Sequence, residues 1–219
     1  MVPLSSITPE VIHLASQWLV LSKPSGWLTI PGRVKISDQE IETPVLSQWA
    51  ELNYGPIWVV HRLDRETSGV ILFARSASAH RDASLWFQER KVRKYYYCLA
   101  QGAPLAPVFK LNHAIKGAPC MTQIEVKKIF SEGFFARIHP YTGRRHQIRI
   151  HLSSSGYPIL GDVQYGGAKE ILRDGKQVVF ARVALHSFRL DLPTGEKFEA
   201  SIPGDFVKWL SQLNVELSS

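Results

Sequence analysis

The segment His61–Gly69 (HRLDRETSG) concentrates side chains that could carry out acid–base or nucleophilic chemistry. It lies between Ile57–Val60 and Gly69–Ala74, two β-prone runs that predict buried strands joined by a polar loop. A carboxylate such as Asp64, presented by a loop between rigid strands, could act as a nucleophile or as a base. The same residue types also satisfy hydrogen bonds within turns, so the spacing alone leaves a structural role for Asp64 and Thr67 open.

A second polar segment, His139–Leu152 (HPYTGRRHQIRIHL), contains three arginines and three histidines within 14 residues. Ile148 and Leu152 stand four residues apart, which predicts a basic helix over 142–153. Thr142 and Gly143 would then expose backbone donors at the helix N-terminus, where the helix dipole favours anions such as phosphate.

Metal binding is not favoured by the spacing of the potential ligands. His146 and His151 are five residues apart and would lie on different faces of the predicted helix, which weakens a site that joins them to His139. Cys98 and Cys120 show no paired metal-ligand spacing, so we interpret them as structural thiols in a reducing compartment.

The elements that must position these segments alternate between strand and helix patterns, with strands in the majority. The expected helices are 43–55, after Thr43-Pro44, and 76–91; the expected strands are 18–22, 26–30, 57–60, 69–74, 95–100, 123–130, 133–138, 178–192 and 197–202. The expected hairpins around residues 131–133 (SEG) and 193–195 (PTG) make the strand pairing mainly antiparallel. No repeat or flexible linker interrupts the chain, so we expect an α+β fold in a single domain over 1–219.

Composition indicates a polyanionic partner and no membrane. Lys and Arg number 26 against 19 Asp and Glu, which gives a net charge of +7 and a pI near 9.5. No apolar run approaches the roughly 20 residues that span a bilayer, and the N-terminus lacks a signal-like pattern. We therefore expect a soluble, cytoplasmic protein, and a monomer by default because no coiled-coil heptads occur.

Several motifs in fixed order resemble those of the RluA family of RNA pseudouridine synthases, over about residues 17–205. HRLDRETSGVILFAR resembles the catalytic HRLDxxTSG motif, and LVLSKPSGWLTIPG resembles the preceding KPxG motif. RKYYYCLAQG is similar to the KxYxAxxxG strand, and YTGRRHQIRIHLSSSGYPILGDVQYGG to TGRxHQIRxHL and GxPIxGDxxYG. RVALHSFRLDLPTGE matches RxxLHAxxLxxxHP with departures at Ser187 and Asp191.

The resemblance implies a pseudouridine synthase fold, with a central, mostly antiparallel mixed sheet, flanking helices and an RNA-binding cleft. It implies isomerisation of uridine to pseudouridine in tRNA or rRNA, without a metal or an organic cofactor. No S4-like module precedes KPSG, so recognition is expected from the catalytic domain itself. Asp64 is the expected catalytic carboxylate, Arg149 its charged partner, and Tyr96 the residue that stacks on the uracil or helps to remove the proton from C5.

The remaining expected site residues contact RNA or position the loop. A target base must leave its stack before it can react, and Arg62 is expected to fill or contact the vacated space. His61 could donate to RNA or anchor the loop. The further expected substrate contacts are Thr67, Lys94, Arg144 and Arg145, although a solvated charged face is an equally ordinary role for each basic side chain. Tyr95 and Tyr97 should face away from Tyr96, because side chains alternate along a strand, and pack.

Two other functional classes remain open at this point. One is a non-catalytic RNA-binding or RNA-folding protein on the same fold. The other is an aspartate-dependent hydrolase, for which a second water-activating carboxylate or a metal cluster is expected and is not evident. Substrate choice is expected to depend on the variable segments 103–121 and 167–177.

Overall fold

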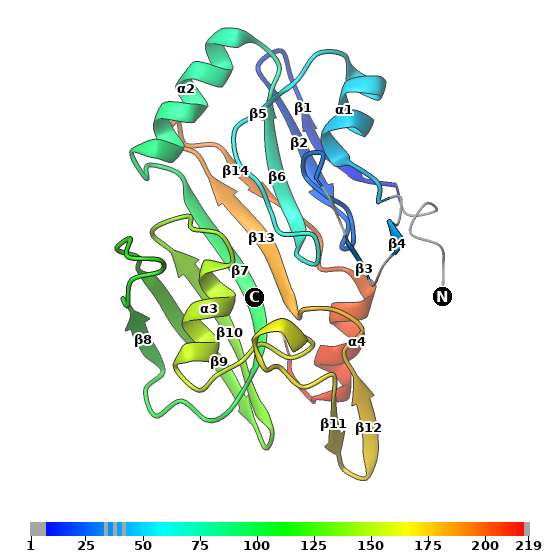
Figure 1. Cartoon of the computed structure of the whole chain (residues 1–219), viewed down its shortest axis with the longest axis vertical. Helices are drawn as coiled ribbons and strands as arrows, with labels where there is room; N and C mark the ends of the chain where they lie inside the picture. Colours follow the sequence, from blue (N-terminus) through cyan, green and yellow to red (C-terminus); the bar gives the residue numbers. More distant parts are fainter. Residues whose placement is uncertain (1–7, 33–34, 37–38, 41–42, 217–219) are drawn as a thin grey trace. The chain divides into compact units, whose positions relative to one another are not determined.

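The computed structural model describes residues 8–32, 35–36, 39–40 and 43–216. They form two compact units, coloured along the chain in Figure 1. Unit 1 contains Met1–Val92 and Arg189–Ser201, and unit 2 contains Arg93–Phe188 and Ile202–Ser219. Each unit is therefore completed by a later part of the chain, and the single domain expected over 1–219 stays a prediction.

Unit 1 is built on an antiparallel sheet with the strand order β1-β2-β6. Strand β5 pairs with β6, and β14 pairs with the end of β13, both antiparallel. The elements of this unit are β1 (Glu10–Leu14), β2 (Trp18–Lys23), β3 (Lys35–Ile36), β4 (Gln39–Glu40), α1 (Leu46–Tyr54), β5 (Trp58–Val59), β6 (Ser68–Ala74), α2 (Ala77–Gln88), β14 (Lys197–Glu199) and the last residues of β13 (Leu185–Asp191).

The core of unit 1 forms where α2 packs on β6 (Figure 1). Every residue of β6 is buried, as expected for a continuous apolar run in the middle of a sheet. Helix α2 begins after Ser76, whose hydroxyl accepts a hydrogen bond from the Ala79 amide at 3.2 Å, and it buries Ala79 and Ala83. This packing gives the loop before β6 a rigid base.

Unit 2 contains a second run of antiparallel strands, in the order β7-β10-β9-β8. Its elements are β7 (Arg93–Gln101), β8 (Val108–Leu111), β9 (Thr122–Phe130), β10 (Gly133–Pro140), α3 (Gln147–Ser154), the 3-10 helix η2 (Val163–Tyr165), β11 (Glu170–Arg173), β12 (Lys176–Val179), the first residues of β13, and α4 (Gly204–Gln212). Strands β11 and β12 form a separate hairpin.

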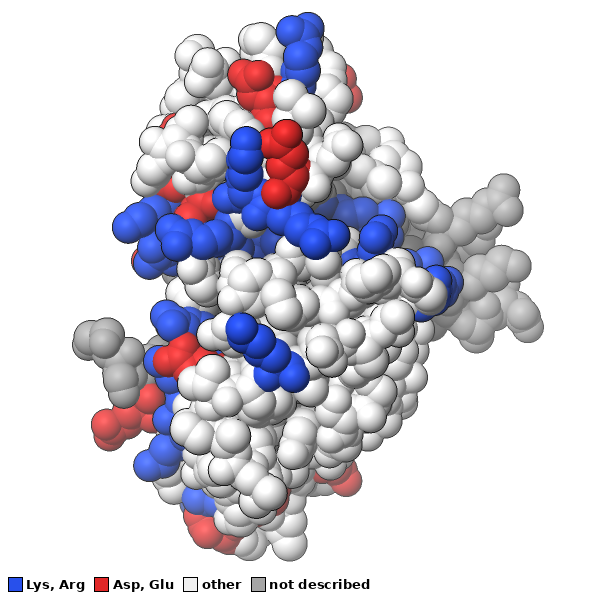
Figure 2. Space-filling view, turned by 90° about the vertical axis from the view of Figure 1, so that its left-hand side faces the viewer, with Lys and Arg blue, Asp and Glu red and all other residues white. Residues whose placement is uncertain are grey.

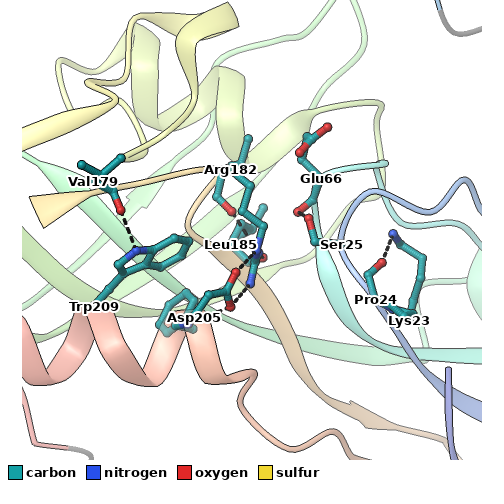
Figure 3. Close-up of polar contacts among 11 residues, drawn as sticks. Lys23, Pro24, Ser25, Glu66, Val179, Arg182, Leu185, Asp205 and Trp209 are labelled. Atoms are coloured by element: carbon teal, nitrogen blue, oxygen red, sulfur yellow. Dashed lines mark hydrogen bonds and ion pairs between the residues drawn. The ribbon is translucent and has the colours of Figure 1, made fainter. Parts of the chain in front are cut away.

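Helix α4 is attached to the rest of unit 2 by two polar contacts, shown on the left of Figure 3. Arg182 donates from Nε and Nη2 to both carboxylate oxygens of Asp205, at 2.6 and 2.9 Å, and Trp209 Nε1 donates to the Val179 carbonyl at 3.0 Å. Burial alone would raise the pKa of Asp205, but the hydrogen bonds and charge of Arg182 hold it below its usual value.

The observed elements confirm the α+β class and correct several boundaries. All the strand pairs given above are antiparallel. The strand expected at 26–30 is wrong, since only an isolated bridge joins Leu28 to Val45. The expected strand 178–192 is divided into β12 and β13, and the first helix begins at Leu46 after Val45 rather than after Thr43.

The largest correction concerns the basic helix expected over 142–153. Helix α3 begins only at Gln147, because His146 adopts a left-handed conformation (φ 55°) that interrupts the helical path. The Gln147 carboxamide oxygen instead accepts from the Thr142 hydroxyl at 2.7 Å and from the Arg144 amide at 3.0 Å. Thr142 and Gly143 are therefore in a loop, and the predicted phosphate site at a helix N-terminus formed by them is wrong.

Among the described residues, no helix is both long enough and apolar enough to cross a bilayer.

Candidate active site

Asp64 lies in the loop that connects β5 to β6 in unit 1, as the sequence predicted. A turn begins at this residue, because the Thr67 amide donates to the Asp64 carbonyl at 3.1 Å. The Asp64 side chain is partly exposed, whereas Thr67 and the strand that follows it are buried. The carboxylate therefore stands at the outer end of a rigid strand.

Lys23, the last residue of β2, and the segment that follows it hold the Asp64 loop by donating to carbonyl groups of that loop. Lys23 is fully buried (0% exposed), and its ammonium group donates to the carbonyls of Arg65, Trp27 and Pro24, at 3.0, 2.7 and 2.9 Å. Figure 3 shows the bond to Pro24. Three acceptors use all three protons of the ammonium group. Ser25 Oγ donates to the Glu66 carbonyl at 2.8 Å, a pair also drawn in Figure 3.

Further hydrogen bonds extend this network to both sides of Asp64. The Thr29 hydroxyl donates to the Leu63 carbonyl at 3.0 Å and accepts from the Leu63 amide at 3.2 Å. The Gly26 amide donates to the Arg65 carbonyl at 2.8 Å. Backbone groups immediately before and after Asp64 are thus held, and the KPSG motif is a structural support of the HRLD motif.

The other loop residues divide between anchoring and exposed positions. His61 Nε2 accepts from the Leu72 amide at 3.0 Å, and its ring stacks on Phe87 with centroids 4.6 Å apart. These contacts favour the anchoring role for His61. Arg62 is exposed, as an RNA contact requires, whereas Thr67 is 2% exposed and belongs to the turn.

Arg149 lies on α3 in unit 2, where it forms a buried ion pair with Asp162 that the sequence analysis did not predict. Its Nε and Nη2 atoms donate to the two carboxylate oxygens of Asp162 at 2.6 and 2.7 Å, and the side chains are 6% and 1% exposed. Nη2 also donates to Gln164 Oε1 at 3.2 Å, and the guanidinium lies 4.9 Å from the centre of the Tyr165 ring. Bidentate geometry and stacking together fix the orientation of Arg149.

The loop that carries Asp162 requires glycine on both sides. Gly161 has a φ of +80°, and a Cβ there would meet the Arg182 carbonyl oxygen at 2.0 Å. A Cβ on Gly167 would meet the Ile159 carbonyl oxygen at 1.8 Å. The Asp162 carbonyl accepts from the Tyr165 and Gly167 amides at 3.0 and 2.8 Å, so the GDVQYGG motif forms a closed turn under Arg149.

Tyr96 lies on β7 with its side chain buried (8% exposed) and is paired in register with Ile138 of β10. Tyr95 and Tyr97 point to the other face of the sheet, because residues alternate along a strand. The Tyr97 ring stacks on Phe188 with centroids 3.9 Å apart. The Tyr95 ring also lies near Phe188, with centroids 6.3 Å apart, so Tyr95 and Tyr97 share a face, while the role of Tyr96 toward the uracil stays a prediction.

Lys94, Arg144 and Arg145, the predicted phosphate contacts of unit 2, differ in their surroundings. Lys94 Nζ donates to the Thr142 carbonyl at 3.3 Å, and burial lowers its pKa from 10.5 to about 8. Arg144 and Arg145 are exposed in the loop before α3. Lys94 thus supports this loop, while the two arginines are available to solvent or to a ligand.

The three histidines considered as metal ligands have separate hydrogen-bond partners. His139 Nδ1 bonds to the Lys94 carbonyl at 2.8 Å, His146 Nδ1 to the Tyr165 hydroxyl at 2.9 Å, and His151 Nε2 to the His113 carbonyl at 3.1 Å. Within the described ranges, no group of three or more His, Cys, Asp or Glu side chains is arranged to hold a metal ion. Cys98 and Cys120 are free and buried.

Burial of the Cys98 thiol has an electrostatic consequence. Desolvation raises its pKa well above the usual value, and the negative charge of Asp162 raises it further. A structural role for this thiol follows, since the thiolate is the reactive form.

Sequence reasoning missed the role of Asp162 and the hydrogen-bond partners of Lys23. Both are in motifs already quoted, KPSG and GDVQYGG, and a lysine or aspartate between apolar runs was the available signal. Their partners could not be read from spacing, because the bonds join residues 42 and 13 positions apart.

Residues 17–154 match the family model described as RNA pseudouridylate synthase, which is more than half of the chain. The chain belongs to this family. Two relatives illustrate the similarity of this family member to curated proteins. It is 29% identical to "Ribosomal large subunit pseudouridine synthase D" of Neisseria meningitidis serogroup A over 94% of this chain and 62% of the relative. It is 32% identical to "Dual-specificity RNA pseudouridine synthase RluA" of Vibrio vulnificus, over 83% and 76%.

Solved structures of pseudouridylate synthase domains share the fold of this family member. "Human RNA Pseudouridylate Synthase Domain Containing 4" has a TM-score of 0.76 at 23% identity, and covers 96% of this chain and 95% of its own. "Human RNA Pseudouridylate Synthase Domain Containing 1" has a TM-score of 0.72 at 25% identity, with 100% and 94% covered. The pseudouridine synthase fold is therefore confirmed.

This pseudouridylate synthase family member also carries the basic surface that its composition predicts. Figure 2 shows Lys and Arg side chains gathered across one face, consistent with the net charge of +7. A surface of this kind attracts polyanions through counterion release.

Proposed function

We propose that this protein isomerises specific uridines in structured tRNA or rRNA to pseudouridine, with Asp64 as the catalytic carboxylate and no cofactor. The observation that carries the proposal is the rigid presentation of Asp64 by the Lys23 network, in a chain that belongs to the pseudouridylate synthase family. A carboxylate that must react at one ribose needs such a support, since small displacements are costly to catalysis. The chain spans 62% of the length of the Neisseria relative, so its activity and substrate are proposals.

The reaction breaks the bond between uracil N1 and ribose C1′, turns the base, and joins C5 to C1′. In the nucleophilic route, a carboxylate oxygen of Asp64 bonds to C1′ as the C1′–N1 bond breaks, and C5 then displaces it. The proton lost from C5 is balanced by the proton gained at N1. In the alternative route, Asp64 acts as a base at the sugar. Both routes need Asp64 ionised and water excluded from the activated sugar.

Arg149 is the proposed partner of Asp64. Its contacts with Asp162 and Gln164 hold the guanidinium through Nε and Nη2. We propose that the positive charge of Arg149 keeps Asp64 ionised, with Asp162 holding the guanidinium plane. Tyr96 is proposed to stack on the uracil or to take part in proton removal from C5.

The RNA contacts follow from exposure. Arg62 is proposed to occupy the space that the flipped uridine leaves, and Arg144 and Arg145 to contact phosphates. The proposed partner is RNA, the proposed state is a monomer, and the proposed compartment is the cytoplasm.

The proposal is tested with tRNA and rRNA transcripts that carry tritium at uridine C5. Joining C5 to C1′ replaces the C5–H bond, so wild-type protein should release tritium into water, with chelator present and no cofactor added. Asp64→Asn should release none while retaining RNA binding, because the two side chains have nearly the same shape. Absence of release from every transcript, by wild-type protein that binds them, would oppose catalysis.

A further inference from the structure

A pocket of about 290 Å³ lies in unit 2 on the face of the sheet opposite to Tyr96. Strands β7, β9 and β10 line it with alternate residues, which therefore share one face. Its walls include Tyr95, Gln123, Glu125, Arg137, His139 and Tyr141. None of these residues belongs to the catalytic set proposed above.

The pocket presents aromatic rings in contact with one another. Tyr95 stacks on His139 with centroids 5.0 Å apart and planes 27° apart, and His139 lies 4.4 Å from the Tyr141 ring. All three side chains are partly exposed, so their contacts leave ring surface open to a ligand. Partly exposed aromatic residues on a sheet are the usual platform on which proteins stack unpaired bases.

Cationic groups lie beside these rings. The Arg137 guanidinium is 5.7 Å from the Tyr95 ring centre, and Lys110 Nζ is 6.0 Å from that of Tyr141. Glu125 is the acidic residue of the lining, and its carboxylate is neutralised by Arg137 at 2.6 Å and by Lys127. Arg93 and Arg137 line the pocket together with Glu125, so the local charge favours an anionic group such as a phosphate over a cation.

The pocket also offers a hydrogen-bonding edge. His139 Nδ1 donates to the Lys94 carbonyl at 2.8 Å, which leaves Nε2 as the acceptor nitrogen of the neutral ring. Burial lowers the pKa of His139, the hydrogen bond to the Lys94 carbonyl raises it, and the charges of Lys94, Arg93 and Arg137 lower it further, so the net shift favours the neutral ring. A neutral imidazole can stack on a base and accept from its amino or imino group.

We propose that this pocket binds an unstacked nucleotide of the RNA substrate, with its base on the rings of Tyr95, His139 and Tyr141 and its phosphate near Arg137 and Lys110. The pocket is continuous in sequence with the loop of Arg144 and Arg145, which starts directly after Tyr141. RNA bound by that loop can therefore extend a flanking nucleotide over the edge of the sheet. This inference rests on the proposed function, because it takes RNA as the partner.

The experiment uses the full chain and a short single-stranded RNA that carries 4-thiouridine and a fluorescent label. Irradiation should join the RNA to the tryptic peptide 138–144, which contains His139 and Tyr141. Peptide 95–110 contains both Tyr95 and Tyr96, so an adduct there does not separate the pocket from the proposed uracil contact. The same RNA annealed to its complement should give no adduct with peptide 138–144, since its bases are paired.

Variants provide the quantitative arm. Tyr141→Ala should raise the Kd about tenfold, the loss expected for one stacked base, while Tyr141→Phe should bind like wild type. Arg137→Gln should reduce the salt slope by about one phosphate contact. Arg173→Gln is the control, because Arg173 is held by Glu132 and Ser131 and does not line the pocket, so the salt slope should not change.

The possible outcomes separate this inference from the proposed function. Unchanged binding by Tyr141→Ala and Arg137→Gln, without adducts in peptide 138–144, overturns the pocket even if the wild type releases tritium. Adducts and weakened binding support the pocket even if no transcript releases tritium. Absence of tritium release would then refute only the proposed catalytic function.

Discussion

Replacing Lys23 by methionine should loosen the Asp64 loop, because the ammonium of Lys23 joins three carbonyl groups from two segments of unit 1. Methionine has a similar length and apolar bulk, so the substitution removes the donors without leaving a large cavity. The Arg65 carbonyl is the acceptor that ties Lys23 to the loop, and it loses its bond to a charged donor.

The magnitude follows from the surroundings of each acceptor. The bond to the Trp27 carbonyl is buried, and an unsatisfied buried acceptor costs about 1–3 kcal/mol. The bonds to the Pro24 and Arg65 carbonyls are partly buried, and water can replace the donor there at about 0.5–1.5 kcal/mol each. Removal of a buried charge recovers part of its desolvation cost, so the expected net loss is about 3 kcal/mol.

Chemical unfolding and a thermal melt measure this loss. For a chain of this size, about 3 kcal/mol corresponds to a fall in Tm of about 6–12 °C. Lys91→Met is the matched control, because Lys91 is exposed and paired only with Glu89 on the surface, and its effect should stay within about 0.5 kcal/mol. Equal stability of the two variants would refute the role given to Lys23. Lys23→Arg should not restore stability, since a guanidinium does not fit a site shaped for a point charge.

Three further predictions concern unit 2. Asp162→Asn should lower the free energy of unfolding by about 3–5 kcal/mol, because it leaves Arg149 charged and buried. Asp205→Asn should lower it clearly less, because the Asp205 side chain is 45% exposed. Equal losses would contradict the argument that burial of the ion pair sets the cost. A ¹³C NMR titration of Lys94, whose signal is assigned by its loss in Lys94→Arg, should have a midpoint near pH 8. A midpoint near pH 10.5 would contradict the lowering of the Lys94 pKa by burial. The pKa of Lys94 is lower in the folded than in the unfolded chain, so the unfolded chain binds more protons between pH 8 and 10.5. Lys94 therefore makes the free energy of unfolding rise with pH over this range. Both buried cysteines should resist iodoacetamide in the folded protein and react after denaturation, and rapid labelling of native protein would show that they are accessible.

Local patterns predicted the strands well, because alternation and apolar runs are properties of neighbouring residues. Strand β6 and the hairpin of β9 and β10 occur close to the expected places, and the polar loop with Asp64 lies between strands as predicted. The opposite orientation of Tyr95 and Tyr96 follows from the period of a strand alone.

Contacts between distant residues were not predictable in this way. The start of α3 depends on the left-handed conformation of His146 and on the Gln147 side chain turning back to Thr142, and periodicity carries neither fact. The pairing of Arg149 with Asp162 and the burial of Lys23 depend on tertiary structure. The resemblance of motifs supplied the residues, and the structure supplied their supports.

The most direct test of the central claim is a pseudouridine map of total RNA from cells without the gene, complemented with wild type or with Asp64→Asn. We expect particular sites to disappear without the gene and to return only with wild type, which would identify both the activity and the substrate. Sites that return equally with Asp64→Asn would contradict the role of Asp64, and a map that never changes would contradict the proposed isomerisation.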